Sequence, residues 1–428
     1  MRTNRFCTSV ALVALAALAL MAAPASAQLA NASASTLGLS GNNTATVRGF
    51  GAISVNPAGL AMPGSGFSLA LLPIQLRTGL DPVDLQDLAD VEGTLLSAAT
   101  KEDWLTRVVA TGGETGSFGA DITEFAFTAG NFGLQVSTVA AGSLTLSPGM
   151  VEAILFGNGG RTGAPADLTL SGAAAEGFAI STGGLSIAFP LASATGDMAF
   201  GATVKYSVGH GVAVARSTSG SVSLDPIRVD VNFPTVHTSE DEDPVNTGNG
   251  VGVDVGFMLK QDRLSFGVSV QNVVNTFAWD ESKLAFRPGT ASFEIGESES
   301  DFDEMPYNSA PASLRTIVTD MTFKPSIRVG AALDVSDDFT LSGDLHNRFS
   351  DDGIALAPKY HLGGGAEFRG LKVIHLRGGA AIITDGIQYS GGVSLVLGPL
   401  NLSAAAAVQS GDIGENVLGQ FSLSFGNR

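Results

Sequence analysis

Residues 264–270 read Leu-Ser-Phe-Gly-Val-Ser-Val, so every second side chain is apolar and the residues between them are Ser or Gly. Strict alternation of this kind places the apolar side chains on one face of a β-strand and the others on the opposite face. Residues 251–259 alternate in the same way, with Val, Val, Val, Phe and Leu at the odd positions. The pattern recurs at 326–334, 339–346, 393–397, 400–408 and 421–425. The second half of the chain is therefore predicted to be a series of β-strands, each with one apolar face.

The less apolar face of these strands distinguishes a membrane barrel from a water-soluble sheet. A soluble sheet carries charged residues such as Lys and Glu on its wet face, whereas this face is mostly Gly, Ser, Thr and Ala. The alternating segments are about 9–12 residues long, the length that a tilted strand needs to cross a bilayer. In lipid all backbone groups must be paired, which strands achieve only in a closed barrel. We predict an all-β fold, a transmembrane antiparallel β-barrel, with a secreted sandwich or solenoid as the alternative.

The composition limits the function classes. Of 428 residues, 44% are hydrophobic, only 15% are charged and 54 are Gly, and the net charge is −18. The mean hydropathy is +0.26, which is high for a soluble enzyme. An acidic chain has no basic surplus to neutralise phosphates, so nucleic acid is not expected as a partner. So much apolar material also argues against a disordered chain.

The first 27 residues have the features of a secretory signal peptide. Arg2 and Arg5 precede an apolar stretch at 10–23, and Ala-Ser-Ala at 25–27 fits the small-residue cleavage rule. The apolar stretch is shorter than the ~20 residues of a membrane-spanning helix, which leaves an N-terminal anchor as the weaker alternative. Cys7 lies in this segment, so the predicted mature chain has neither a disulfide nor a thiolate metal site, and its net charge is −20.

The connections between the predicted strands alternate in length. Tight turns such as Gly398-Pro399 are separated by longer polar connections, as the two sides of an outer membrane impose. Acidic runs at 240–243 and 297–304 fall in the long connections and are interpreted as solvated loops. Two segments, about 81–110 and 147–157, have helical character and are predicted as helical insertions.

No catalytic, metal or cofactor motif is evident, and we predict neither an enzyme nor a bound cofactor or metal. If the apolar face meets lipid, the other face lines the lumen, and the few charged residues there are the candidates for ligand contact. Lys205 and Arg328 are the best candidates for a ligand carboxylate, although neutralising ion pairs between lumen residues are the simpler interpretation. The predicted lumen residues are Lys205, Asp254, Arg328, Asp334, Asp344, His346, Glu367, His375 and Arg377.

Residues 56–61, Asn-Pro-Ala-Gly-Leu-Ala, form a motif in which Asn56 can cap a short helix that begins at Pro57. Together with Ala58 and the segments 250–272 and 324–330, this motif resembles the FadL-type superfamily of outer-membrane barrels (long-chain fatty-acid transporters), with PorV-like and TraF-like relatives. The resemblance covers nearly the whole chain after the signal. The insertion at 81–109 departs from the plain transporter pattern and is closer to TraF-like relatives.

The resemblance implies a barrel of about 14 strands (12–16) at 66–428, with residues 28–65 as a plug-like segment that includes Asn56, Pro57 and Ala58. It also implies a passive channel or transporter in the cell outer membrane, with hydrophobic small molecules such as long-chain fatty acids as ligands and outer-membrane lipid around it. In transporters of this type the ligand leaves sideways into the membrane. The alternative is an accessory barrel that docks partner proteins for secretion, assembly or conjugation, through the helical insertion or the acidic loops.

Overall fold

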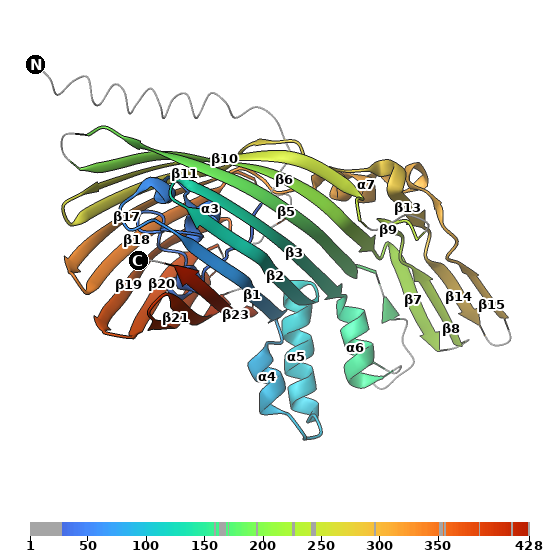
Figure 1. Ribbon diagram of the computed structural model, residues 1–428. Coiled ribbons are helices and arrows are strands. Elements are labelled where there is room, and N and C mark those ends of the chain that lie inside the picture. The colour runs from blue at the N-terminus through green and yellow to red at the C-terminus, as the bar shows by residue number, and fades with distance from the viewer. Residues whose placement is uncertain are drawn as a thin grey trace, which may run out of the picture.

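A closed β-barrel forms most of the protein (Figure 1). The predicted signal peptide at 1–27 lies outside the residues that the structure describes. The computed structural model describes residues 28–157, 160–161, 168–169, 171–193, 196–224, 227–240, 245–294, 297–350, 354, 357–384, 386–411 and 414–426.

Fourteen antiparallel strands, counted among the described residues, make up the barrel wall, which confirms the predicted fold class. The ring closes because β1 pairs with β2 on one side and with the last strand, β23, on the other. The described residues contain no helix with the length and apolar character of a membrane span. In order around the ring the strands are β1 (Ser68–Asp81), β2 (Glu114–Ala129), β3 (Phe132–Leu146), β5 (Ala174–Leu191), β6 (Asp197–Arg216), β10 (Gly248–Gln261), β11 (Leu264–Asn275), β17 (Ser326–Ser336), β18 (Phe339–Arg348), β19 (Tyr360–Leu371), β20 (Ile374–Ile383), β21 (Gly386–Leu397), β22 (Leu400–Gly411) and β23 (Gly414–Gly426).

The alternation in sequence becomes an apolar outer face and a small or polar inner face. On β11, Leu264 and Phe266 are 47% and 48% exposed, whereas Ser265 and Ser269 are buried. The same division holds on β17 and β18, where outward Val329 and Leu341 are exposed. Side chains of strands point alternately to the two faces, so the closed ring leaves its apolar side chains on the outside.

Two β-bulges interrupt this apolar exterior. Glu124 and His210 are the extra residues where the register shifts between β2 and β3 and between β5 and β6. Glu124 accepts a hydrogen bond from Thr138 at 2.7 Å, Thr138 contacts the Ser181 hydroxyl at 2.7 Å, and His210 contacts the same hydroxyl at 2.7 Å. A polar chain therefore crosses four neighbouring strands, with each half-buried member bonded to the next.

The N-terminal segment, residues 28–65, lies inside the barrel (Figure 1). It contains α2 (Ala34–Gly38), α3 (Gly51–Val55) and the 3-10 helix η1 (Pro57–Ala61), and most of its residues are buried. Its contacts reach far along the chain: the Asn31 side chain donates to Gln420 of β23, and the Ala30 amide donates to Ser137 of β3 at 3.1 Å. The segment is therefore packed against strands from both halves of the barrel.

Wall glycines allow the backbone of this segment to approach closely. A Cβ atom on Gly201 would lie 2.5 Å from the amide nitrogen of Ala58, and one on Gly256 would lie 2.9 Å from Cδ of Pro57. Both distances are below van der Waals contact, so no side chain fits between the wall and the motif.

Three helices stand together at one end of the barrel: α4 (Leu85–Asp90), α5 (Ala98–Thr111) and α6 (Pro148–Phe156) (Figure 1). They lie close to the two ranges predicted as helical insertions, although Asp81 still belongs to β1 and α5 extends to Thr111. Ser147 caps α6 by accepting a hydrogen bond from the amide of Met150. Their shared core consists of Val83, Trp104, Leu105, Val108, Val151 and Leu155.

An ion pair joins α4 to α5, and it predicts a pH dependence. Arg107 donates to Asp87 at 2.8 Å, and this hydrogen bond lowers the pKa of Asp87 below its ordinary value of 3.8. A carboxyl with a lowered pKa in the folded state contributes stability above pH 3.8, and this contribution is lost as the pH falls through the folded pKa. Both side chains are partly exposed, so the contribution is below about 1 kcal/mol. Carbon NMR of the Asp87 carboxyl should give a titration midpoint below 3.8, which Arg107→Gln should raise. An unchanged midpoint would contradict the assignment.

The long connections form structure that hydropathy did not predict. A small sheet, separate from the wall, contains β4 (Leu168–Thr169), β7 (Ser219–Leu224), β8 (Ile227–Asn232), β14 (Thr290–Glu294) and β15 (Glu297–Asp301). The interpretation of 297–304 as a solvated loop is therefore wrong for Glu297–Asp301, which forms an edge strand on β14. Its sequence Glu-Ser-Glu-Ser-Asp has no apolar face, which is why the strand gave no hydropathy signal. Of the other acidic run, 241–243 lie outside the described residues.

The remaining elements cover the end of the barrel at which α4, α5 and α6 stand. They are β9 (Thr235–Thr238), β12 (Ala278–Trp279), η2 (Glu281–Lys283), β13 (Leu284–Arg287), β16 (Met305–Pro306), η3 (Tyr307–Ser309) and α7 (Ala312–Asp320). An apolar cluster that includes Phe277, Trp279 and Leu314 holds them to the wall, and the indole nitrogen of Trp279 donates to the carbonyl of Met321 at 2.9 Å.

Candidate functional site

The structure divides the predicted lumen residues into separate groups. Lys205 and Asp254 form one group on β6 and β10, and Arg328, Asp344 and His346 form a second on β17 and β18. Arg377 on β20 lies in a third, with Glu367 of β19.

The first group is a buried ion pair. The Lys205 ammonium donates to Asp254 at 2.6 Å and to the Asn272 side-chain oxygen at 2.7 Å. The two charged side chains are 1% and 4% exposed. Asn272 has a left-handed backbone (φ 59°), and its amide donates to Asp254 at 2.7 Å. Lys205 is therefore paired within the protein and is not open to a ligand carboxylate, because Asp254 on the neighbouring strand already occupies that position.

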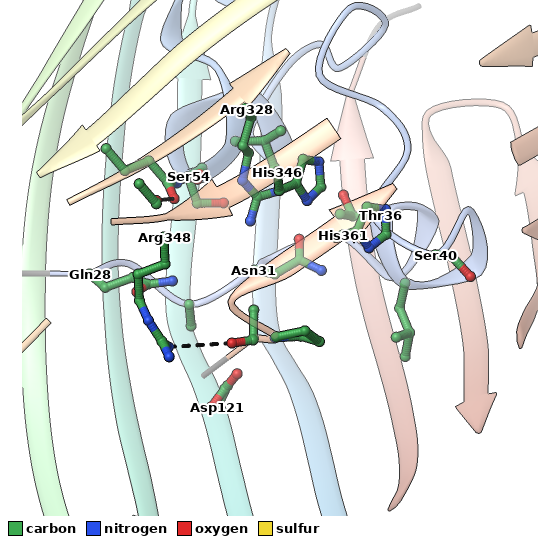
Figure 2. Close-up of a pocket in the computed structure, with 18 of the residues that line it drawn as sticks. Gln28, Asn31, Thr36, Ser40, Ser54, Asp121, Arg328, His346, Arg348 and His361 are labelled. Atoms are coloured by element: carbon green, nitrogen blue, oxygen red, sulfur yellow. Dashed lines mark hydrogen bonds between the residues drawn. The ribbon is translucent and has the colours of Figure 1, made fainter. Parts of the chain in front are cut away.

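The second group borders a cavity of about 170 Å³. The His346 ring stacks on His361 with centroids 4.4 Å apart, and His346 contacts Asp344 at 3.2 Å. Asp344 also accepts a hydrogen bond from the amide of Thr44 in the N-terminal segment at 2.9 Å. Figure 2 shows Arg328 beside His346 at this cavity.

Arg328 has a different environment from Lys205. Among the described residues its side chain makes no hydrogen bond, and no carboxylate lies within 4.0 Å of its guanidinium. The cavity wall carries four basic residues, Lys324, Arg328, Arg348 and Lys359, against one acidic residue, Asp121. Asp121 is itself paired with Arg77 at 2.6 Å. Lys324 is likewise paired, with Asp320 at 3.7 Å, whereas the carboxylates of Asp344 and Asp254 attract Arg328 only from beyond ion-pair distance.

The same cavity has an apolar side. The apolar residues in its wall come from the N-terminal segment, from the β18–β19 connection and from β23, and they are Leu29, Leu37, Val55, Ile354 and Leu418. A cavity with a cationic group and an apolar lining suits a molecule with an acidic head and an apolar body.

The Asn-Pro-Ala motif joins the N-terminal segment to the wall. The Asn56 side chain donates to the carbonyl of Thr44 at 3.0 Å and to the carbonyl of Phe257 on β10 at 3.2 Å. Its oxygen accepts from the amide of Ala58 at 3.2 Å, so Asn56 caps η1, which begins at Pro57. All three residues of the motif are buried.

A second cavity lies on the other side of the N-terminal segment, near the short turns. Its volume is about 400 Å³, and basic residues again outnumber acidic ones in its wall. Lys260 and Arg369 belong to it and share the register of Asp254 and Glu367, so the alternation could have identified them. Arg48 could not have been predicted as a cavity residue, because the N-terminal segment has no periodic pattern that shows which way its side chains point. The described residues include no group of His, Cys, Asp and Glu arranged to hold a metal ion.

Comparisons with known proteins agree with this architecture. The chain is similar to the crystal structure of the Ralstonia pickettii toluene transporter TbuX, with 13% sequence identity and a TM-score of 0.54. The alignment covers 92% of this chain and 98% of that chain. The P. putida toluene transporter TodX is 11% identical with a TM-score of 0.50, covering 92% of this chain and 98% of that chain. These likenesses establish the fold. A search among curated proteins gave no significant match.

One family model matches residues 53–345, which is more than half of the chain, and its description is "F plasmid transfer operon, TraF, protein". The matched region begins in the N-terminal segment before the Asn-Pro-Ala motif and includes the helical insertions, eight complete wall strands from β1 to β17 and most of β18. The chain therefore belongs to this TraF family, with the architecture of the FadL-type barrels.

Proposed function

We propose that the protein is an outer-membrane channel for hydrophobic small molecules that carry an acidic group, such as long-chain fatty acids. The cavity at Arg328 carries the proposal, because the guanidinium has no carboxylate within 4.0 Å among the described residues and apolar side chains line the same cavity. The solved structures with the same fold are described as toluene transporters, which supports a hydrophobic ligand. The apolar outer wall supports a place in the outer membrane, reached after cleavage of residues 1–27.

In this proposal the ligand carboxylate binds Arg328, and the apolar chain extends towards Leu29 and Leu418. An arginine can pair with a carboxylate through two parallel hydrogen bonds, which gives both affinity and orientation. Lys205 has no part in binding because Asp254 neutralises it.

Replacing Arg328 by Gln should weaken the binding of a long-chain fatty acid by the purified barrel at least about tenfold, as expected for one charge-assisted contact. Binding is measured by titration calorimetry in a non-ionic detergent. Arg263→Gln is the matched control, since Arg263 is exposed in the β10–β11 turn and lines neither cavity. No binding by the unchanged protein, or equal binding by Arg328→Gln, would overturn the proposal. Heat-modifiable gel migration and fractionation with the outer membrane test the location.

A second candidate function is an accessory barrel that docks a partner protein. The observation that favours it is the apolar exposure on the two helical insertions, where Leu95 is 99% and Ile154 is 69% exposed. Exposed apolar side chains outside the wall are typical of protein contacts. Under this hypothesis, Leu95→Ser with Ile154→Ser should abolish site-specific crosslinking to the partner in cells and leave fatty-acid binding unchanged. Crosslinking that persists in the double variant would exclude this surface.

A further inference from the structure

We propose that the second cavity is a binding site for a phosphoryl group, on the opposite side of the N-terminal segment from Arg328. The cavity lies between that segment and the short-turn ends of β10, β17, β18, β19 and β20. Arg48 and Gly49 contribute one side of it, and the wall strands contribute the other. The proposal does not depend on the identity of the channel's substrate.

The charges around the cavity do not balance. Four basic residues line it, Arg48, Lys260, Arg369 and Arg377, against two acidic residues, Asp334 and Glu367. Asp337 and Asp338, in the β17–β18 turn, and Asp197 are exposed to solvent and do not line the cavity. The wall therefore carries a surplus of two positive charges.

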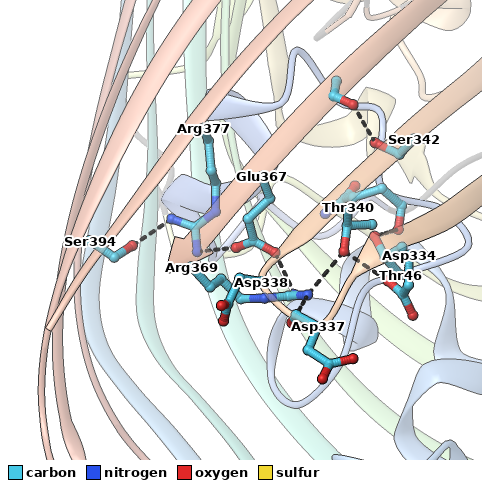
Figure 3. Close-up of polar contacts among 12 residues, drawn as sticks. Thr46, Asp334, Asp337, Asp338, Thr340, Ser342, Glu367, Arg369, Arg377 and Ser394 are labelled. Carbon is cyan, nitrogen blue, oxygen red and sulfur yellow. Dashed lines mark hydrogen bonds and ion pairs between the residues drawn. The ribbon is translucent and has the colours of Figure 1, made fainter. Parts of the chain in front are cut away.

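The pairing pattern locates this surplus (Figure 3). Lys260 pairs with Asp334 at 2.8 Å, which accounts for one charge of each sign. Arg369 and Arg377 share Glu367, through its two separate oxygens at 3.0 Å and 2.7 Å. One carboxylate thus faces two guanidinium groups, and one of their two charges has no counterpart.

Arg48 supplies the other unmatched charge. Its guanidinium donates to the carbonyls of Pro63 at 3.2 Å and Val47 at 2.8 Å and contacts the Met258 sulfur at 3.4 Å. No carboxylate of a described residue lies within ion-pair distance of it, and Asp334 and Asp197 attract it only at longer range. Carbonyl oxygens orient the group without neutralising it, so its charge remains available at the cavity.

Arg377 provides an independent indication of a ligand. Its side chain is only 5% exposed, and its Nε atom is buried with no hydrogen-bond partner. A buried donor on a charged group costs free energy unless an acceptor is supplied. The Nη1 atom of Arg377 donates to Ser394 at 2.5 Å, and the Ser394 hydroxyl contacts Ser403, so hydroxyl groups continue the polar wall.

A phosphoryl group meets these requirements best. It carries close to two negative charges at neutral pH and three strong acceptor oxygens, which match a surplus of two and several N–H donors. A monocarboxylate would neutralise only half of the surplus. The group has two possible sources, free phosphate or a phosphomonoester on a lipid, and both present the same chemistry.

The test is titration calorimetry of lipid-free protein in a non-ionic detergent, at constant ionic strength, with inorganic phosphate as the probe. We expect one phosphate per chain, with affinity lowered at least about tenfold by Arg377→Gln and by Arg48→Gln. Arg48→Gln keeps the test informative if loss of the buried Arg377 prevents folding. Arg263→Gln and Arg328→Gln should bind as the unchanged protein does, and Arg377→Gln should still bind fatty acid, which separates this site from the channel proposal.

A second arm uses phosphatidic acid added to the micelles in place of phosphate. Binding of phosphatidic acid alone, with the same sensitivity to Arg48→Gln and Arg377→Gln, supports the site and assigns it to a lipid head group. The proposal is overturned if neither probe binds, or if all four variants bind equally, since the contact would then be a general effect of charge.

Discussion

Replacing Gly201 by alanine is expected to displace the N-terminal segment within the lumen and raise the conductance of the barrel. The new Cβ would lie 2.5 Å from the amide nitrogen of Ala58, and its neighbours there are all backbone atoms of Pro57 and Ala58. Backbone atoms cannot rotate away as the end of a side chain can, so the segment must move as a unit. Overpacking of this kind costs about 1–3 kcal/mol, and the cost falls on the contact that holds residues 28–65 in the lumen.

Single-channel recording in planar bilayers measures the effect. The control is Gly183→Ala on β5, because a Cβ at Gly183 meets nothing within 4 Å. Asn56→Ala should change conductance in the same direction, since it removes the bonds to Thr44 and Phe257. If the Gly201→Ala barrel folds and has the conductance of the unchanged protein, the position of the segment does not depend on the close contact between Gly201 and the backbone of Pro57 and Ala58.

Removing Asp254 is expected to produce a large loss of stability. Asp254→Ala leaves the Lys205 ammonium buried with only the Asn272 side chain to receive it. Breaking a buried ion pair from one side costs about 3–5 kcal/mol, because the remaining charge is uncompensated. The free energy of unfolding is measured by urea titration in lipid vesicles.

Two comparisons make this result specific to buried charge. Lys260→Ala breaks a pair whose side chains are 33% and 28% exposed, and this should cost less than about 1 kcal/mol. Lys205→Met combined with Asp254→Ala removes both charges and should recover much of the loss. If the double variant is as unstable as Asp254→Ala alone, packing and not charge would be the cause.

The sequence was sufficient to predict the strands and their faces, but not which charged residues meet. Alternation assigns Lys205 and Asp254 to the lumen, because each lies between apolar neighbours that face outward. Their contact depends on the register between β6 and β10, in which Lys205 lies opposite Gly252 and Asp254 lies opposite Thr203. The hydrophobic pattern and the geometry of the connecting turn together set a register. A long connection, and not a tight turn, joins β6 to β10, so the pattern of either strand alone does not say which residues lie opposite each other.

The same reasoning explains what the sequence did not reveal about the cavities. Both cavities have the N-terminal segment as one wall, and that segment has no periodic pattern from which the direction of Arg48 could be read. The stacking of His346 on His361 likewise requires β18 and β19 to pair at those two residues, as they do. Strand β15 of the small sheet was missed for a different reason, since it carries no apolar residue.

The position of residues 28–65 also constrains the order of assembly. The segment precedes β1 in the chain, and the ring that surrounds it closes only when β23, which follows every other wall strand, pairs with β1. Its bonds to Asp344, His361 and Gln420 span 300, 319 and 389 residues, far more than the bonds between wall strands that follow one another in the chain. Contacts across such separations form late, because much chain entropy must be lost first. The earliest described residues are therefore among the last to find their partners, and closure of the seam traps them inside.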